Sequence, residues 1–276
     1  MTFEPEQMGR SRNDLAQKLR ELRTRAGLTG DRLARRCNMS QSQISRFETG
    51  RKTPSLVDVE RILRALDATA DTVTEITTLA RIANTEWQGK RSSWRRGMEK
   101  RQTELAALEA ESAEFRYFLP AMITGLLATP AYMLAGLAHT PGDPARTIAR
   151  KLEQQTVLHD RAKHFTFLLT EQAARWAIIP PSGMITQIDR LISLSRLPNL
   201  RIGVIPTGTV LPRGPMNTFT IYDDRLATVE NFTGRMVFRD ARDVSEHLAV
   251  FSLFEQHAHF DDDARVLLRL WADNYR

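Results

Sequence analysis

The chain has 276 residues, a length typical of about two domains, and its 39 Lys and Arg residues outnumber its 33 Asp and Glu residues by six. A hydrophobic fraction of 42% excludes a mainly disordered chain, and a single cysteine excludes a disulfide framework and a cysteine-based zinc finger. The sequence starts without the apolar segment of a signal peptide, so we expect a cytoplasmic protein.

The excess positive charge is confined to the front of the chain. Residues 1–110 hold 21 basic and 15 acidic residues, whereas residues 111–276 hold 18 of each. The surplus reaches ten between Arg10 and Arg101, where 21 basic residues accompany 11 acidic ones. A basic front joined to a neutral rear predicts a polyanion-binding module attached to a domain with another role.

One uncharged segment, residues 119–138, raises the question of membrane insertion. Two prolines and several Thr and Gly residues dilute it, whereas a spanning helix needs about 20 strongly apolar residues. We therefore expect no membrane association. The segment predicts a buried strand, a turn at Thr129 and Pro130, and a core helix.

Apolar periodicity and helix-ending residues predict five short helices near the front. Leu15, Leu19 and Leu22 recur at helical spacing, and Gly27 follows them as a stop signal. The predicted helices cover residues 13–26, 31–37, 41–48, 56–66 and 73–82. We expect an N-terminal tail over 1–12, an all-α domain over 13–82 and a basic helical linker over 83–112. That linker fits a solvated charged helix, a dimer seam or a second basic contact surface.

Residues 113–276 alternate between strand and helix patterns. Such alternation predicts an α/β or α+β domain, so the whole chain is expected to be multi-domain. The clearest predicted strands cover 165–170, 200–205, 219–222 and 226–230. The clearest predicted helices cover 171–177, 184–195, 244–257 and 263–271.

The segment from residue 29 to residue 48 meets the helix-turn-helix template. Two helices that cross closely need a small residue at their contact, and Ala34 supplies it. Asn38 then suits the left-handed turn, and Ile44 packs the second helix down. The alternative is a helical hairpin without a nucleic-acid role. The other inward positions hold Leu33, Cys37, Met39 and Phe47.

Residues 13–67 resemble the xenobiotic-response-element, or lambda-repressor, type of helix-turn-helix domain. The resemblance rests on Leu19-Arg20, Arg23, Gly27-Leu28-Thr29, Leu33-Ala34, Ser40-Gln41-Ser42, Ile44-Ser45-Arg46, Glu48, Gly50-Arg51 and Pro54. In that family the third helix enters the major groove of double-stranded DNA. The resemblance therefore implies base contacts for Gln41, Ser42 and Arg46, with Gln43 and Ser45 as further candidates. Gln suits adenine, and Arg suits guanine.

Other residues of this segment are expected to contact phosphate or support the motif. Ser40 is expected to cap the third helix, and Arg51 and Lys52 follow that helix. Thr29 opens the motif and completes the expected DNA-binding set. The family often has Gln at the next position, where this chain has Gly30, so some affinity is expected from Arg32 or Arg35 instead. Glu48 is expected to be structural, bonded to the loop or to an arginine.

A second pattern lies in the rear domain and comprises Ile123 to Tyr132, Leu168 to Glu171, Arg175-Trp176, Met184 with Gln187, Leu197 to Leu200, Val204 to Pro206 and Val229-Glu230. On this pattern, the rear domain resembles the uncharacterised C-terminal domain found in actinobacterial, sporulation-associated regulators. Such regulators are described as antitoxin-like because they pair with a small partner protein. Thr124 and Ala128 replace the Pro and Gln of the expected Pro-Gly-Leu-Leu-Gln-Thr core. The resemblance implies no catalytic site.

Glu171, Arg175 and Trp176 form a candidate partner or ligand site, or else a helix ion pair beside a core tryptophan. His247, His257 and His259 lack the spacing of a zinc site. The Asp261 to Asp263 run suits a helix start better than a cation site. The sequence also lacks a phosphate loop and the common hydrolase motifs, so we expect no metal, no cofactor and no enzymatic activity.

These patterns together predict a sequence-specific transcriptional regulator that binds double-stranded DNA as a homodimer. The rear domain is expected to dimerise, or to sense a ligand or a partner protein. The alternative is an antitoxin-like interaction module whose main role is to hold a small partner protein.

Overall fold

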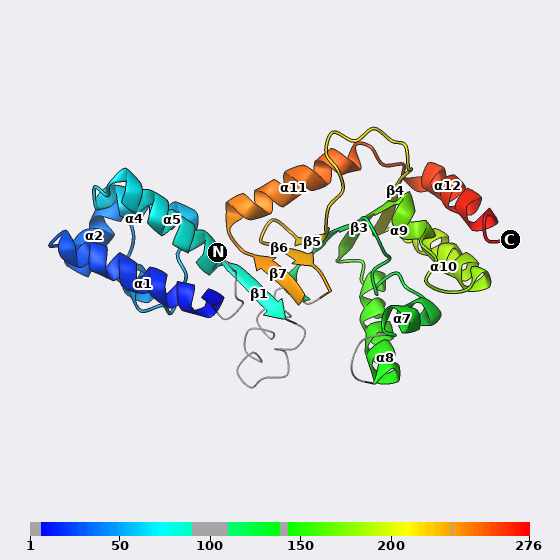
Figure 1. Ribbon diagram of the computed structural model, residues 1–276, viewed down its shortest axis with the longest axis horizontal. Coiled ribbons are helices and arrows are strands. Elements are labelled where there is room, and N and C mark those ends of the chain that lie inside the picture. Colours follow the sequence, from blue (N-terminus) through cyan, green and yellow to red (C-terminus); the bar gives the residue numbers. More distant parts are fainter. Residues whose placement is uncertain (1–6, 90–109, 139–142, 233) are drawn as a thin grey trace. The chain divides into compact units, whose positions relative to one another are not determined.

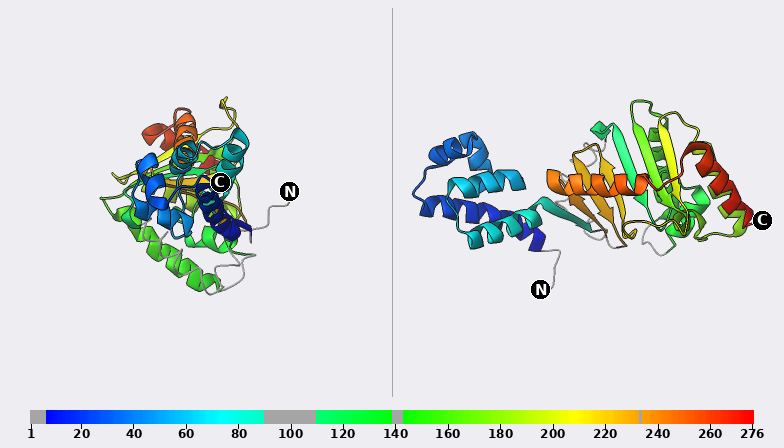
Figure 2. Two further views of the ribbon diagram at one scale, coloured as in Figure 1. Left: turned by 90° about the vertical axis from the view of Figure 1, so that its left-hand side faces the viewer. Right: turned by 90° about the horizontal axis from the view of Figure 1, so that it is seen from above.

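The computed structural model describes residues 7–89, 110–138, 143–232 and 234–276. The chain forms two compact units (Figures 1 and 2). The first comprises Met1–Trp94 and Thr233–Val244, and the second comprises Arg95–Phe232 and Ser245–Arg276. A short segment from the rear of the sequence therefore belongs to the first unit. The expected domain boundaries at residues 82 and 112 assigned that segment to the rear domain.

The first unit contains the five expected helices (Figure 1). They are α1 (Gln7–Arg25), α2 (Gly30–Cys37), α3 (Gln41–Glu48), α4 (Leu56–Ala65) and α5 (Ala70–Asn84). The first helix starts six residues earlier than expected, inside the predicted tail. One apolar cluster joins all five helices, which confirms the all-α prediction for this part. Its buried members include Leu15, Leu19, Leu33, Ile44, Phe47, Val59, Ile62 and Ile76.

A pair of antiparallel strands completes the first unit. Strand β1 (Thr85–Gly89) pairs with β7 (Gly234–Phe238), so that Thr85 lies opposite Phe238. The helical linker expected over residues 83–112 is therefore wrong at residues 85–89, because pairing with a distant strand overrides local helix preference. Its central part, residues 90–109, lies outside the described residues.

The second unit is built on a mixed sheet with the strand order β6-β5-β2-β3-β4. Strands β2, β3 and β4 run parallel, whereas β5 is antiparallel to both β2 and β6. Aromatic residues fill its centre, where Phe118 lies opposite Phe219 in the register. The strands are β2 (Glu114–Leu119), β3 (His164–Thr170), β4 (Leu200–Ile205), β5 (Thr218–Tyr222) and β6 (Leu226–Glu230).

Helices cover both faces of this sheet, with α11 on one side and α7, α8 and α10 on the other (Figure 1). The expected α/β character is confirmed. The helical segments are α7 (Pro130–Gly136), α8 (Pro144–Gln154), the 3₁₀ turn η2 (Gln155–His159), α9 (Glu171–Arg175), α10 (Pro181–Leu194), α11 (Ala241–Glu255) and α12 (Asp261–Asp273).

The segment 119–138 differs from its prediction. Strand β2 ends at Leu119 instead of starting there, and a loop connects it to Thr129. Thr129 caps α7, so the expected turn and the expected helix after it are confirmed. Within the residues that the structure describes, no helix has both the length and the apolar character needed to cross a membrane.

Candidate nucleic-acid interface

The turn between α2 and α3 is fixed by three local devices. Thr29 caps α2 by accepting a hydrogen bond from the backbone N–H of Arg32. Asn38 adopts the left-handed conformation, with φ at 54° and ψ at 48°, which Asn tolerates better than most residues. Ser40 then caps α3, and Gln43 completes a reciprocal capping box with it. The chain therefore reverses direction within the residues that the sequence pattern singled out.

The inward side of the motif confirms the template. Ala34 is buried where the two helices meet, and Ile44 and Phe47 anchor α3 in the core. Cys37 is buried as well, and burial raises the pKa of its thiol. These contacts fix the orientation of α3, and they leave its opposite side to solvent.

The outward side of α3 carries polar side chains with free hydrogen-bonding capacity. Gln41, Ser42, Ser45 and Arg46 are exposed, and the Arg46 Nε–H donates a 3.1 Å hydrogen bond to the backbone oxygen of Ser42. This bond directs the guanidinium group along the helix toward its N-terminal end. The four side chains therefore form a continuous polar surface, which we call the α3 face.

Gln43 has a different place from its neighbours. Its Oε1 atom accepts a 3.1 Å hydrogen bond from the backbone N–H of Ser40, and its side chain is half-buried. The capping box therefore already uses the amide oxygen that a base contact would require. The sequence places Gln43 among the candidates for base contact, because helical position alone does not reveal a capping bond.

Basic residues flank the α3 face. Arg51 and Lys52 are exposed just after the helix, and the Lys52 ammonium lies 5.9 Å from the centre of the Phe47 ring. Arg32 is also exposed near the start of α2, whereas Arg35 pairs with Asp31 at 3.0 Å. Of the two arginines that were expected to compensate for Gly30, Arg32 is therefore the one whose side chain has no acidic partner among the described residues.

A partly buried ion pair braces the motif from behind. Arg23 on α1 donates two hydrogen bonds to the Glu48 carboxylate, at 2.6 and 2.9 Å, and a third to the Leu28 oxygen at 2.7 Å. The hydrogen bond to Glu48 raises the pKa of Arg23. Glu48 therefore ties the end of α3 to α1 and the loop, which confirms its expected structural role.

The start of α4 is held by a contact that the sequence did not indicate. Ser55 caps this helix, and the Oδ2 atom of Asp240 accepts a 2.8 Å hydrogen bond from the Leu56 N–H. Asp240 is buried, and it immediately precedes α11. Nearby, Arg242 makes two hydrogen bonds of 2.7 and 2.8 Å with Glu60. No local pattern can reveal these pairs, because their members are more than 180 residues apart.

The second candidate set, Glu171, Arg175 and Trp176, lies in α9 and at its C-terminal cap, directly after β3. Glu171 pairs with Arg175 and accepts a 2.8 Å hydrogen bond from the Thr207 N–H. Burial alone would raise the pKa of Glu171, but these bonds outweigh it and lower the pKa. Of the alternative of a helix ion pair beside a core tryptophan, the ion pair is present, but the core tryptophan is wrong, because Trp176 is 56% exposed. Glu171 therefore braces the loop after β4, and Trp176 remains open to solvent.

The loop at residues 124–129 is clamped by a polar network. Gln187 donates to the Leu127 oxygen and accepts from the Thr129 N–H, at 3.0 and 2.7 Å. Arg190 bonds to the same Leu127 oxygen and to Gln155, and burial lowers the pKa of Arg190. The backbone of this loop is therefore engaged in holding the fold.

Two family profiles match the chain. One is described as a helix-turn-helix domain and matches residues 14–76. The other is described as a domain of unknown function (DUF5753) and matches residues 102–270, more than half of the chain. The chain belongs to the DUF5753 family. No curated protein matches it.

Several solved structures share weak similarity with this DUF5753 protein. One is a phospholipase D family member, Nuc from Salmonella typhimurium, with 8% identity, a TM-score of 0.37, and coverage of 64% of this chain and 97% of that chain. NucT from Helicobacter pylori has 10% identity, a TM-score of 0.36, and coverage of 63% and 96%. TrmBL2, an archaeal chromatin protein, has 12% identity, a TM-score of 0.32, and coverage of 73% and 64%.

The described residues of this DUF5753 protein contain no group of three or more His, Cys, Asp or Glu side chains able to hold a metal ion. The His259 backbone bridges to Val204 at the edge of β4, and His247 packs its ring against Phe219. The Asp261 to Asp263 run forms the first turn of α12, as expected, but no side chain caps that helix.

Proposed function

We propose that this protein is a sequence-specific transcriptional regulator that binds double-stranded DNA. The α3 face enters the major groove, where Gln41, Ser42 and Arg46 contact base edges, with Ser45 beside them. Arg32, Arg51 and Lys52 contact phosphates, together with the backbone amides that follow Ser40 at the start of α3 and the Thr29 hydroxyl. The protein acts by binding and not as an enzyme, and it is of the xenobiotic-response-element type.

The observation that carries this proposal is the combination of a fixed turn and a solvent-exposed polar face on α3. A helix that reads bases must keep its polar side chains away from the core and hold its angle against the domain. Asn38 and the Ser40 capping box set that angle, and the ion pair of Arg23 with Glu48 maintains it. The surplus of positive charge in this region suits a phosphate backbone.

The proposal includes a homodimer, formed through the second unit. One recognition helix contacts only a few base pairs, so a two-fold site with half-sites about one helical turn apart gives adequate specificity. The same unit is proposed to sense a ligand or a partner protein.

The experiment first selects a preferred duplex from a random-sequence library with the full-length protein. Its affinity is then measured for the wild type, for Arg46→Ala, and for Arg81→Ala as a control, since Arg81 is an exposed arginine on α5. We expect a loss of about 1–3 kcal/mol for Arg46→Ala and no loss for the control. Affinity should also fall steeply between about 50 and 200 mM salt. Equal affinities, or a flat salt response, would refute the proposal.

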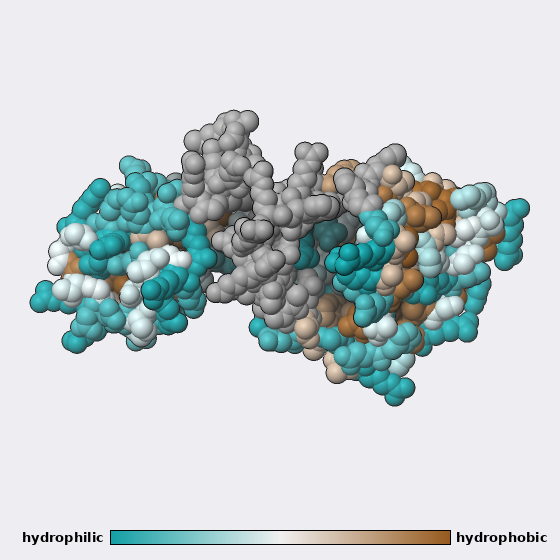
Figure 3. Space-filling model, turned by 90° about the horizontal axis from the view of Figure 1, so that it is seen from below, coloured by the Kyte–Doolittle hydropathy of each residue, from teal (hydrophilic) through white to brown (hydrophobic). Residues whose placement is uncertain are grey.

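A second candidate function is an antitoxin-like module that holds a small partner protein. Its support is the apolar surface of the second unit, part of which Figure 3 shows as brown residues on one face. Leu134 on α7 is 54% exposed, and Val266 and Leu270 on α12 are 58% and 59% exposed. Recovery of a stoichiometric small protein with the tagged chain, lost on Leu134→Asp or Leu270→Asp, would favour this function.

A further inference from the structure

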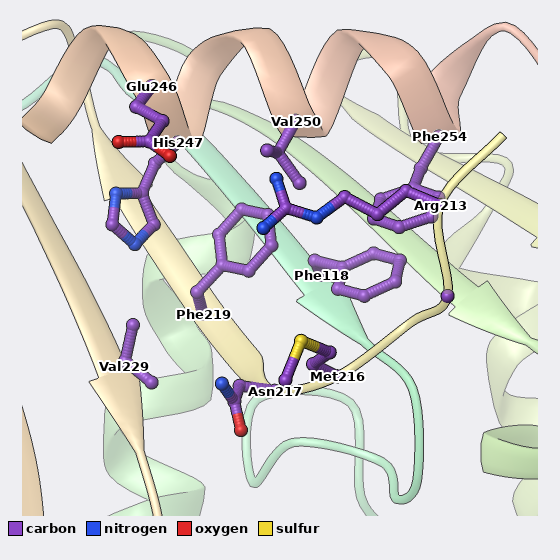
Figure 4. Close-up of a pocket in the computed structure, with 11 residues that line it drawn as sticks. Phe118, Arg213, Met216, Asn217, Phe219, Val229, Glu246, His247, Val250 and Phe254 are labelled. Carbon is purple, nitrogen blue, oxygen red and sulfur yellow. The ribbon is translucent and has the colours of Figure 1, made fainter.

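The pocket between α11 and the sheet of the second unit has an aromatic lining that is already packed (Figure 4). The rings of Phe118, Phe219 and Phe254 are buried, and the centre of the Phe118 ring lies 5.2 and 4.4 Å from those of the other two. These rings therefore offer no free face to a ligand. The loop between α3 and α4 of the first unit, by contrast, carries exposed charges and is held by residues from distant parts of the sequence.

This loop covers residues 49–55 and carries Arg51 and Lys52, which the proposed function assigns to DNA phosphates. Both side chains are exposed. The first half of the loop is held from within the motif, because the Lys52 N–H donates a 3.1 Å hydrogen bond to the backbone oxygen of Arg46 on α3. The second half is held by contacts from outside the motif.

Two side chains hold the peptide groups on either side of Ser55. The Nδ2 atom of Asn84 donates a 2.9 Å hydrogen bond to the backbone oxygen of Pro54. The Oδ2 atom of Asp240 accepts a 2.8 Å hydrogen bond from the backbone N–H of Leu56. One donor and one acceptor thus fix the end of the loop, and we call Asn84 and Asp240 the loop clamp.

The pairing of β1 with β7 brings the two residues of the loop clamp together. Asn84 directly precedes β1, and Asp240 follows β7 by two positions. Because Thr85 lies opposite Phe238 in this antiparallel pair, both residues emerge at the same end of it. Asn84 is also tied to α5, since its Nδ2 atom donates a second 2.9 Å hydrogen bond to the Ala80 oxygen. All these residues belong to the first unit.

We propose that Asn84 and Asp240 are positioning residues for DNA binding, which hold the loop so that Arg51 and Lys52 meet the phosphates beside the α3 face. A loop that is ordered before binding loses less conformational entropy on the DNA, so its charged side chains contribute more to affinity. This inference rests on the proposed function.

The loop clamp acts on phosphate contacts and leaves base contacts unaffected. Helix α3 is held separately, by the ion pair of Arg23 with Glu48. Phosphate contacts position the protein on the duplex and carry no sequence information directly. Loss of the loop clamp should therefore weaken binding to all duplex sequences by the same factor.

The test uses full-length variants and the selected duplex, at a temperature where circular dichroism shows each variant to be folded. Asp240→Ala removes the acceptor, whereas Asp240→Asn makes the same change in charge and keeps an acceptor oxygen. Asp71→Ala, at an exposed position in the first turn of α5, is a control with the same change in charge. We expect Asp240→Ala to bind about fivefold or more weakly than the control, and Asp240→Asn to lose less.

The salt dependence separates positioning from a purely structural role. Loss of one or two phosphate contacts should reduce the slope of log affinity against log salt concentration by about one to two in Asp240→Ala. A purely structural role would lower the stability of the protein and leave this slope unchanged. Asn84→Ala removes the bond to Pro54 and should reduce the slope in the same direction, and it provides the same test if Asp240→Ala does not fold.

A last comparison combines the substitutions. In a protein that already carries Arg51→Gln and Lys52→Gln, Asp240→Ala should cause no further loss, because the loop has no charge left to position. A wild-type slope in both Asp240→Ala and Asn84→Ala, or a full additional loss in the combined variant, would overturn the role of the loop clamp while the proposed function stands. If the wild type binds no duplex, the proposed function itself fails, and this inference fails with it.

Discussion

The carboxylate of Asp240 accepts a 2.8 Å hydrogen bond from the backbone N–H of Leu56, across 184 positions of sequence. The bond is buried, and it satisfies one of the N–H groups that the first turn of α4 leaves without a helical partner. A residue near the C-terminal end of the chain is thus part of the unit that carries the helix-turn-helix motif.

The first prediction concerns this bond. Asp240→Ala leaves the Leu56 N–H buried without an acceptor, so it should lower the free energy of unfolding of the first unit by about 1–3 kcal/mol. Asp240→Asn keeps an acceptor oxygen and should lose less. Native-state hydrogen exchange at the Leu56 amide measures the effect, and equal protection in the wild type and in Asp240→Ala would show that the bond contributes nothing.

The second prediction concerns the ion pair between Arg23 and Glu48, whose side chains are only 16% and 11% exposed. A double-mutant cycle with Arg23→Met and Glu48→Gln should give a coupling energy of about 1–3 kcal/mol, because the pair is charged, doubly hydrogen-bonded and largely shielded from water. Lys18 and Glu75, at 44% and 53% exposure, offer a matched surface pair in the same unit. Their cycle should give less than about 1 kcal/mol. Similar coupling energies for both pairs would contradict the claim that shielding from water strengthens the pair of Arg23 and Glu48.

The third prediction concerns the turn. Asn38 has a φ of 54°, which a β-branched side chain accommodates poorly. Asn38→Val should therefore destabilise the first unit by about 1 kcal/mol or more, whereas Asn38→Gly should be tolerated. Thermal unfolding followed by circular dichroism distinguishes them, and equal stability of both variants would contradict the left-handed turn.

The fourth prediction is a pH dependence. The pKa of Glu171 is lowered in the folded state, so its ionised form stabilises the second unit above the pKa of the unfolded chain. That contribution disappears as the pH falls through the lowered folded-state pKa. Glu171→Gln should therefore be less stable than the wild type at neutral pH, and the difference should shrink in acid. Urea unfolding at several pH values measures the free energy of unfolding of both proteins. A difference that stays constant with pH would show that the ionised Glu171 carboxylate does not stabilise the second unit.

Local patterns predicted most of the front unit correctly. The spacing of Ala34, Asn38 and Ile44 gave the two central helices, because small, left-handed and branched residues have specific positions in this motif. Ser40 and its helix were also identified, since capping residues act over three positions. The part that Gln43 takes in this cap was not predicted, because a glutamine at this position can bond either to the cap or to a base.

Most features that the sequence did not predict depend on pairing between distant parts of the chain. Strand β1 looked helical, and its true partner β7 lies near the opposite end of the chain. The bond from Leu56 to Asp240 has the same character. Helix α8 was not predicted because its apolar positions are few and no residue of it is buried.

The central claim is that the α3 face reads base pairs. Its most direct test is the full base-preference profile of the wild type and of Arg46→Ala, measured on every single-base variant of the selected duplex. We predict that Arg46→Ala loses preference at one guanine in each half-site, by about 1–3 kcal/mol, and retains it elsewhere. An unchanged profile, or a uniform loss at all positions, would contradict base reading by Arg46.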